Sequence, residues 1–283
     1  MSDEALRKRD TSIAARARVG ANFFRARGLD RPDSPAPSGI IDSMRDYGAR
    51  DAASNASRDA LAPSVRSFFE DTASLELWIE PRWAWWALPL AWVWHYVARW
   101  LGQLCLPVRP SRITTETIAL DDRALGSPSV RGSRAVIRRY DDRACMQVLV
   151  YSVFDAGDQG MMLARFPLPW SVLEGVLRCE FIDEDQRGLR GARLTSEGHR
   201  ETGVFLRFGR GASRRWRTQF GESLSLWDAQ SDRAPAKLAA RGPWKDATII
   251  GLHEQRFMGL VIVRHSYWFR PIPSPDRGAR PRT

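Results

Sequence analysis

Alternation of apolar and polar residues runs through the chain from Ile113 onward and constrains its fold more than any other feature. In residues 173–181, for example, Leu173, Leu177, Cys179 and Phe181 alternate with charged residues. Residues two apart lie on one face of a strand, so each such run offers one face to a core. The gaps between runs are too short for crossover helices. The pattern predicts a mainly β (α+β) fold, a curved antiparallel sheet or closed β-barrel of about nine or ten strands covered by one or two N-terminal helices.

The chain divides into three parts by composition. Residues 1–61 are polar and basic and contain three prolines, which predicts a disordered basic arm in which only 12–27 have the pattern of a short basic helix. Residues 62–272 form a single β-rich domain that begins with a helix at Pro63, because proline suits the first turn. Residues 273–283 are expected to be a flexible tail. Strands are expected at 75–80, where Pro81 ends the first, and then at 113–120, 134–140, 145–154, 160–166, 173–181, 188–195, 203–209, 216–226, 247–256 and 258–269.

Tryptophan is concentrated in one segment, residues 83–106, which is predicted to contain a helix from Pro89 to about Leu104. Half of the twelve tryptophans lie here: Trp83, Trp85, Trp86, Trp92, Trp94 and Trp100. On a helix, His95, Arg99 and Gln103 form one polar stripe on an otherwise apolar cylinder. One interpretation is a helix that covers the sheet, with this stripe facing water.

Two membrane interpretations compete with that one. Tryptophan prefers the headgroup level of a bilayer, so the segment also fits a helix lying at a membrane surface or contacting an amphipathic ligand. Residues 83–98 carry no formal charge, but as a helix they are roughly 24 Å long, which is short for a transmembrane span. All three interpretations remain open on the sequence.

The histidines supply the candidates for catalysis. His253 and Glu254 resemble the start of the zinc motif H-E-x-x-H, but Phe257 occupies the second ligand position. Inside a barrel, His253, Glu254 or His265 could act as a general base or contact a ligand. No other common catalytic motif is present, and the three cysteines, Cys105, Cys145 and Cys179, have no paired spacing and are interpreted as small buried hydrophobes. We therefore predict neither a metal nor a cofactor.

A net charge of +10 favours an anionic partner. The densest basic cluster is a predicted hairpin that could contact anions with Arg207, Arg210, Arg214, Arg215 and Arg217 and could stack a base on Trp216. A hairpin with solvated arginines explains the same pattern. Binding of nucleic acid is therefore the third of the functional hypotheses.

Two short stretches resemble a known group of sequences. Residues 65–72 (Val-Arg-Ser-Phe-Phe-Glu-Asp-Thr) and 103–107 (Gln-Leu-Cys-Leu-Pro) are similar to lines found in a family of uncharacterised bacterial proteins. The resemblance covers about a tenth of the chain and implies no activity. It indicates that the residues from about 65 onward form one unit.

The leading hypothesis is a non-enzymatic protein that binds an apolar or amphipathic small molecule. The absence of a secretory signal predicts a cytoplasmic protein, and the tryptophan segment suggests peripheral association with the inner face of the membrane. The alternative is an enzyme that acts on a lipid-like or polyketide-like substrate in a barrel cavity. An entirely apolar interior would favour carriage, whereas His253 or His265 within hydrogen-bond reach of a carboxylate would favour catalysis.

Overall fold

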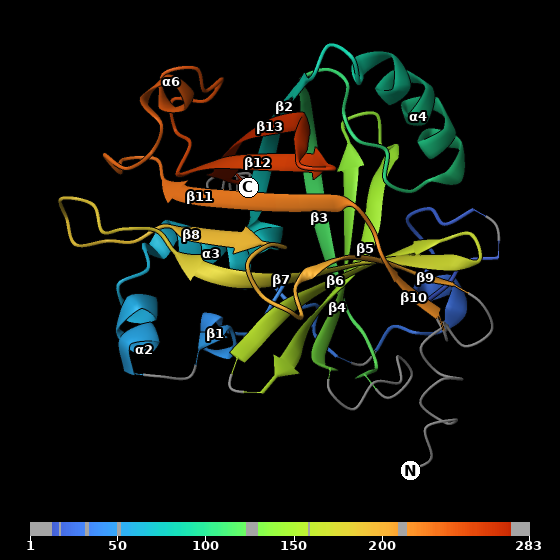
Figure 1. Ribbon diagram of the computed structural model, residues 1–283, viewed down its shortest axis with the longest axis horizontal. Coiled ribbons are helices and arrows are strands. Elements are labelled where there is room, and N and C mark those ends of the chain that lie inside the picture. The colour runs from blue at the N-terminus through green and yellow to red at the C-terminus, as the bar shows by residue number, and fades with distance from the viewer. Residues whose placement is uncertain are drawn as a thin grey trace, which may run out of the picture.

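The protein folds around a closed β-barrel of ten antiparallel strands, as the alternation predicted. The computed structural model describes residues 13–16, 18–31, 34–49, 52–122, 130–157, 159–208 and 214–272 (Figure 1). The barrel strands are β2 (Leu75–Trp83), β3 (Ser111–Ala119), β4 (Val130–Tyr140), β5 (Cys145–Ala156), β6 (Gln159–Leu168), β7 (Ser171–Phe181), β8 (Ala192–Thr195), β11 (Phe220–Asp228), β12 (Ile249–Phe257) and β13 (Leu260–Pro271). They follow one another around the barrel in this order, and pairing of β13 with β2 closes the ring.

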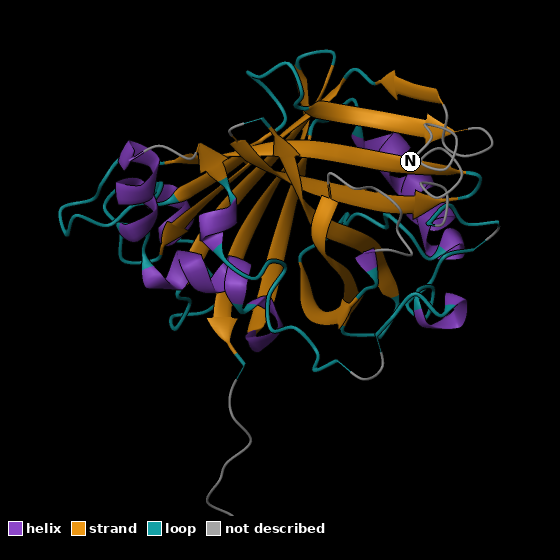
Figure 2. Ribbon diagram, turned by 90° about the horizontal axis from the view of Figure 1, so that it is seen from below, coloured by secondary structure: helices purple, strands orange, loops and turns teal. Residues whose placement is uncertain are grey.

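Three further strands extend the wall. β9 (Gly203–Phe208) pairs with the first half of β7 and with β10 (Arg214–Arg217), while β8 pairs with the second half of β7. The two-residue strand β1 (Gly48–Ala49) pairs with the start of β6. Figures 1 and 2 show the strands as one curved wall. Because β7 pairs with β8 in the ring and with β9 at its other end, the β9–β10 hairpin lies outside the ring.

The interior of the barrel holds the main core, and helix α3 (Pro63–Glu70) packs against it. Alternate residues of the strands, among them Leu77 and Phe269, pack in this core with Val65, Phe68 and Phe69 of α3. The rings of Phe68 and Phe269 meet edge to face, with centroids 5.2 Å apart. Helix α3 begins at Pro63, where the sequence predicted a helix start.

Residues 1–61 were expected to be a disordered arm, but the described residues between 13 and 61 pack against the barrel. Ile13 and Phe24 are buried against the outer face of β3, β4 and β5, and Ile40 and Tyr47 belong to the main core. Short helices η1 (Arg25–Arg27), η2 (Met44–Asp46) and α2 (Ala52–Asp59) interrupt this segment, and η3 (Thr72–Ser74) follows α3. The apolar residues of this segment are too widely spaced in sequence to form a cluster of their own. Because the segment runs along the barrel, each of them packs against the strands instead. The first twelve residues and the expected tail, 273–283, lie outside the described residues.

Two strand boundaries also differ from the prediction. Strand β2 continues through Pro81 to Trp83, because β3 pairs with β2 only at residues 77–79 and the missing N–H of Pro81 therefore costs no ladder bond on that side. The strand expected at 216–226 is divided into β10 and β11, with Thr218 and Gln219 between them. The last helix, α6 (Ala236–Ala239), lies in the long connection between β11 and β12.

Candidate functional site

Helix α4 (Leu88–Leu101) presents its large apolar side chains to solvent. It stands outside the strands at the upper right of Figure 1. Its buried residues are the small Ala91 and Ala98. The exposed face, called here the α4 face, includes the turn before the helix and consists of Trp85, Trp86, Leu88, Leu90, Val93, Trp94, Tyr96, Val97 and Trp100. The interpretation of α4 as a cover for the sheet with its polar stripe in water is therefore wrong.

Two residues of the predicted polar stripe, His95 and Gln103, contact the protein instead, whereas Arg99 is exposed and pairs with Asp142 at 3.1 Å. Gln103, just beyond the helix, is fully buried, and its side-chain amide donates to the carbonyls of Val148 at 2.6 Å and Pro167 at 2.9 Å. Its side-chain oxygen accepts from the backbone N–H of Val148 at 2.9 Å. His95 approaches the carbonyl of Leu106 at 3.1 Å. Gln103 therefore has partners in β5 and β6, and His95 has one in the segment that follows α4, so the polar side of the helix is attached to the protein and the apolar side stays uncovered.

The turn after α4 depends on a glycine. Gly102 has φ of 68°, and its N–H bonds to the carbonyls of Ala98 and Arg99. A Cβ at this position would lie 2.9 Å from the backbone nitrogen of Gly20. The segment that includes Gly20 therefore runs directly against the helix end, and Val19 donates its N–H to Leu101 at 2.9 Å.

The α4 face has cations at its edges and apolar neighbours on the barrel. Trp85 is 86% exposed and Trp100 64%, while Trp83 and Trp92 are half-buried. The guanidinium of Arg18 lies 6.0 Å from the ring of Trp100 and that of Arg109 5.3 Å from Trp92. None of the helices in the described part of the chain has both the length and the hydropathy of a transmembrane span.

The turn between β12 and β13 continues the apolar surface. Phe257, Met258 and Leu260 are exposed there. The N–H of Ala84, which precedes α4, donates to the carbonyl of Ile262 in β13 at 2.9 Å. The start of α4 and this turn are therefore neighbours on one end of the molecule.

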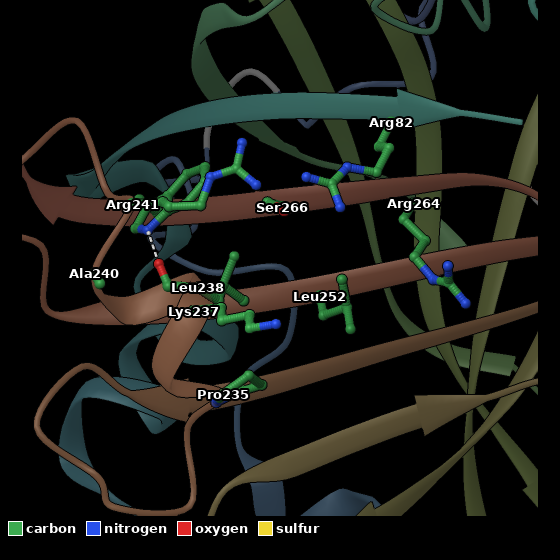
Figure 3. Close-up of a pocket in the computed structure, with 10 residues that line it drawn as sticks. Arg82, Pro235, Lys237, Leu238, Ala240, Arg241, Leu252, Arg264 and Ser266 are labelled. Atoms are coloured by element: carbon green, nitrogen blue, oxygen red, sulfur yellow. Dashed lines mark hydrogen bonds between the residues drawn. The ribbon is translucent and has the colours of Figure 1, made fainter. Parts of the chain in front are cut away.

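A groove of about 500 Å³ lies on the outer face of β2, β12 and β13, beneath the connection that carries α6. Figure 3 shows cationic side chains around an apolar floor. The cations are Arg82, Lys237, Arg241 and Arg264, and the apolar residues are Pro235, Leu238, Ala240, Leu252 and Trp268. Arg241 pairs with Glu80 at 2.6 Å and Arg264 with Glu254 at 2.5 Å. Charge and apolar surface together fit an amphipathic anion.

The barrel interior contains a chain of three hydrogen-bonded side chains. His253 of β12 contacts the hydroxyl of Tyr267 with Nδ1 at 2.9 Å and the carboxylate of Glu222 with Nε2 at 3.3 Å. Tyr267 is buried, whereas the side chains of His253 and Glu222 remain 16% and 20% exposed. A carboxylate on one ring nitrogen holds the proton there and leaves the other nitrogen as an acceptor. A histidine thus meets a carboxylate in the barrel, as the enzyme hypothesis requires.

His265 lies beside this chain. Its ring centroid is 5.9 Å from that of His253, and it stacks on Tyr267 at 6.1 Å. Complete burial, followed by the charge of His253, lowers the pKa of His265 to about 3. Burial raises the pKa of Tyr267 and of Tyr151, which faces the same interior from β5. The interior polar cluster comprises Arg138, Tyr151, Glu222, His253, His265 and Tyr267, and at neutral pH its tyrosines and His265 are uncharged.

Glu254, the third catalytic candidate from the sequence, does not join this cluster. It faces outward from β12, where burial favours its neutral form but Arg264 and Arg256 hold the pKa below its usual value. Glu222 and Tyr267 were not among the residues predicted from the sequence. Strand alternation places Tyr267 on the face of His265, but only the pairing of β11 with β12 brings Glu222 within reach of His253.

The arginine hairpin is partly engaged by the protein itself. Arg207 and Arg215 pair with the buried carboxylate of Glu174 at 2.7 and 2.9 Å, and the Arg215 guanidinium lies 3.5 Å from the ring centroid of Phe205. Arg214 and Arg217 are exposed, and Arg210 lies outside the described residues.

The three cysteines are free thiols, with Cys105 and Cys179 buried and Cys145 half-buried. Burial raises the pKa of Cys105 and of Cys145 to about 11 and that of Cys179 to about 12. Thiols of this kind are mostly protonated at neutral pH and poorly nucleophilic.

Comparisons with known proteins identify one curated relative. No family model matches the chain, and no solved structure does. The chain is 26% identical over 168 residues to the protein described as "Uncharacterized membrane protein YndJ" of Bacillus subtilis (strain 168), an alignment covering 59% of this chain and 29% of that protein. The chain therefore spans less than a third of that relative. The predicted resemblance to uncharacterised bacterial proteins is confirmed.

Proposed function

We propose that this protein is a peripheral membrane-binding β-barrel that docks on anionic bilayers through the α4 face. The observation that carries the proposal is the outward orientation of the large apolar side chains of α4. A helix on the surface of a globular protein normally packs its apolar stripe against the core. An exposed apolar patch of this size indicates an interaction site.

The composition of the α4 face favours a bilayer over a protein partner. Tryptophan and tyrosine rings suit the headgroup level, where the ring is apolar and its polar group stays hydrated. Arg18 and Arg109, next to Trp100 and Trp92, would meet lipid phosphates at the same depth. The net charge of +10 adds a longer-range attraction to an anionic surface.

The groove beside the α4 face supports binding of amphipathic small molecules. Arg82 and Lys237 make no ion pair or hydrogen bond with the described residues and are free to pair with an anionic headgroup. Leu238, Leu252 and Trp268 offer an apolar floor for the attached chain. Because Arg82 immediately precedes Trp83, a molecule leaving the bilayer would reach the groove over a short distance.

Flotation with lipid vesicles tests the membrane proposal. The full-length protein is mixed with vesicles of phosphatidylglycerol and phosphatidylcholine, and variant Trp85→Ser/Trp100→Ser is compared with Trp216→Ser, which removes an exposed tryptophan from β10. Each buried tryptophan is worth about 2 kcal/mol, so the double variant should lose at least about a hundredfold in partitioning. Trp216→Ser should bind as the wild type does. Failure of the wild type to float, or equal losses in both variants, would refute the proposal.

A second candidate function, acid–base catalysis in the barrel, is favoured by the contact of His253 with Glu222. A substrate group that takes the place of the Tyr267 hydroxyl at Nδ1 would give its proton to His253 while Glu222 orients the ring. Hydrolysis of p-nitrophenyl esters with acyl chains of increasing length is a direct assay. Activity that disappears in His253→Gln supports this function, and activity equal to that of the buffer excludes ester hydrolysis. Nucleic-acid binding receives less support, because Arg207 and Arg215 are already paired with Glu174.

A further inference from the structure

Two cations of the groove on β2, β12 and β13 lie directly opposite each other on neighbouring strands. Arg82 of β2 is the register partner of Arg264 of β13, and both side chains line the groove. Side chains at such positions have Cβ atoms about 4.5–5.5 Å apart, and like charges there destabilise a sheet. Arg264 pairs with Glu254 on its other side at 2.5 Å, whereas Arg82 has no ion pair with a described residue. An anion bound between the two guanidinium groups would relieve their repulsion.

The connection that carries α6 adds two further cations to the groove. Lys237 and Arg241 line it, and Arg241 pairs with Glu80 at 2.6 Å. In Figure 3 the guanidinium groups of Arg82 and Arg241 point toward each other from either side of Ser266. The register explains this arrangement, because Ser266 of β13 is the partner of Glu80, which holds Arg241. Cations from two separate segments therefore gather around one hydroxyl group.

The floor of the groove is apolar, and the same connection packs on it. Leu238, Ile250 and Trp268 form a buried cluster, and half-buried Leu252 packs against it. The indole N–H of Trp268 donates to the carbonyl of Leu238 at 3.2 Å, so the connection is held directly on the sheet. The groove volume of about 500 Å³ lies within the ordinary range of small-molecule sites, about 300–1,000 Å³. The groove therefore offers space for an apolar chain next to its cations.

We propose that this groove binds the phosphate monoester of an apolar alcohol. Arg82 and Lys237 pair with the phosphate, and Leu252 and Trp268 contact the hydrocarbon. A guanidinium presents parallel N–H groups that match the oxygens of a phosphate. This inference rests on the proposed binding of amphipathic molecules in the groove, and it names their chemical class.

Charge balance favours a phosphate monoester over a carboxylate or a sulfate ester. Glu80 and Glu254 each pair with one of the four cations. Arg82 and Lys237 remain without a carboxylate partner in the described part of the chain, so the groove keeps two positive charges. A phosphate monoester carries about −1.5 to −2 charges at pH 7, because its second pKa is about 6. A carboxylate or a sulfate ester carries a single negative charge and would leave one of these cations unmatched.

Titration calorimetry of the full-length protein at pH 7.5, without vesicles, tests this site. Octyl phosphate is the ligand. Octyl sulfate has the same chain with a single charge, and inorganic phosphate has the charge without the chain. We expect octyl phosphate to bind at least about tenfold more tightly than either, because each comparison removes one ion pair or the whole apolar contact.

Two variants locate the binding. Arg82→Gln/Lys237→Gln removes both unpaired cations and should weaken octyl phosphate binding at least about a hundredfold. The matched control is Arg214→Gln, which removes an exposed arginine of β10 and should bind octyl phosphate as the wild type does. The three side chains are exposed, so both variants should keep the wild-type circular dichroism spectrum. The vesicle variant Trp85→Ser/Trp100→Ser should also keep wild-type affinity for octyl phosphate, because neither tryptophan lines the groove.

The inference is overturned if octyl sulfate or inorganic phosphate binds as tightly as octyl phosphate, or if the folded double variant of the groove retains wild-type affinity. Loss of octyl phosphate binding in Trp85→Ser/Trp100→Ser would also overturn it, because the ligand would then lie on the α4 face. A wild type that floats with vesicles but does not bind octyl phosphate refutes the groove site and leaves membrane docking in place. A wild type that binds octyl phosphate but does not float supports the groove site and refutes membrane docking.

Discussion

Replacing His265 by Phe should make the protein more stable, and more so at acidic pH. His265 contributes two buried nitrogens without hydrogen-bond partners, and a buried polar group of this kind costs about 1–3 kcal/mol. Phenylalanine can retain the stacking on Tyr267 and the edge contact with Trp83, whose ring centroid is 6.3 Å away. We expect a gain of about 1 kcal/mol at pH 7, after a small cost for the larger ring.

The pH dependence follows from the lowered pKa of His265. The unfolded chain binds a proton at this residue below the usual value of 6.5, whereas the folded protein does so only below about 3. Keeping the ring neutral therefore adds no cost to the folded state above pH 6.5 and an increasing cost as the pH falls from 6.5 toward 3. Each pH unit in this window removes about 1.4 kcal/mol, which amounts to about 2 kcal/mol between pH 7 and pH 5.

Urea unfolding at a series of pH values measures the effect. The other three histidines are common to both proteins, so the difference in the free energy of unfolding between His265→Phe and wild type isolates residue 265. This difference should grow by about 2 kcal/mol from pH 7 to pH 5. A difference that stays constant with pH would mean that His265 is not held neutral in the folded protein, and the reasoning about the interior polar cluster would fail.

Three further substitutions test the packing around the barrel by urea unfolding. Phe24→Ala should lower the free energy of unfolding by about 3–5 kcal/mol, because Phe24 is fully buried in the segment that was predicted to be a disordered arm. A loss below about 0.5 kcal/mol would support the disordered arm instead. Arg215→Gln should cost about 1–2 kcal/mol by weakening the pairing of buried Glu174, whereas exposed Arg214→Gln should be neutral. Gly160→Ala should cost at least about 2 kcal/mol, because its Cβ would collide with a backbone oxygen of η2; an unchanged midpoint would contradict this packing.

The secondary structure of the barrel was largely predictable because alternation is a local property. Runs such as 173–181 carry their own evidence for a buried face, and the short gaps between runs excluded crossover helices. The segment before Pro63 was predicted less well because its burial leaves no local pattern in the sequence. Ile13, Phe24 and Ile40 are too far apart to show a local period, and only the strands they lie against make them core residues.

The candidate sites depended more strongly on the tertiary structure. Residue spacing predicted that α4 would be a helix with one polar stripe, but a helical period is the same whether the stripe faces water or protein. Burial of Gln103 against β5 and β6 decided that the tryptophans face outward. His253 and His265 could be identified as candidates, but their partners could not. Glu222 and Arg138 lie far away in sequence, and only the closure of the barrel brings strands β4, β11, β12 and β13 around one interior, because strand alternation specifies a face and says nothing about which faces meet.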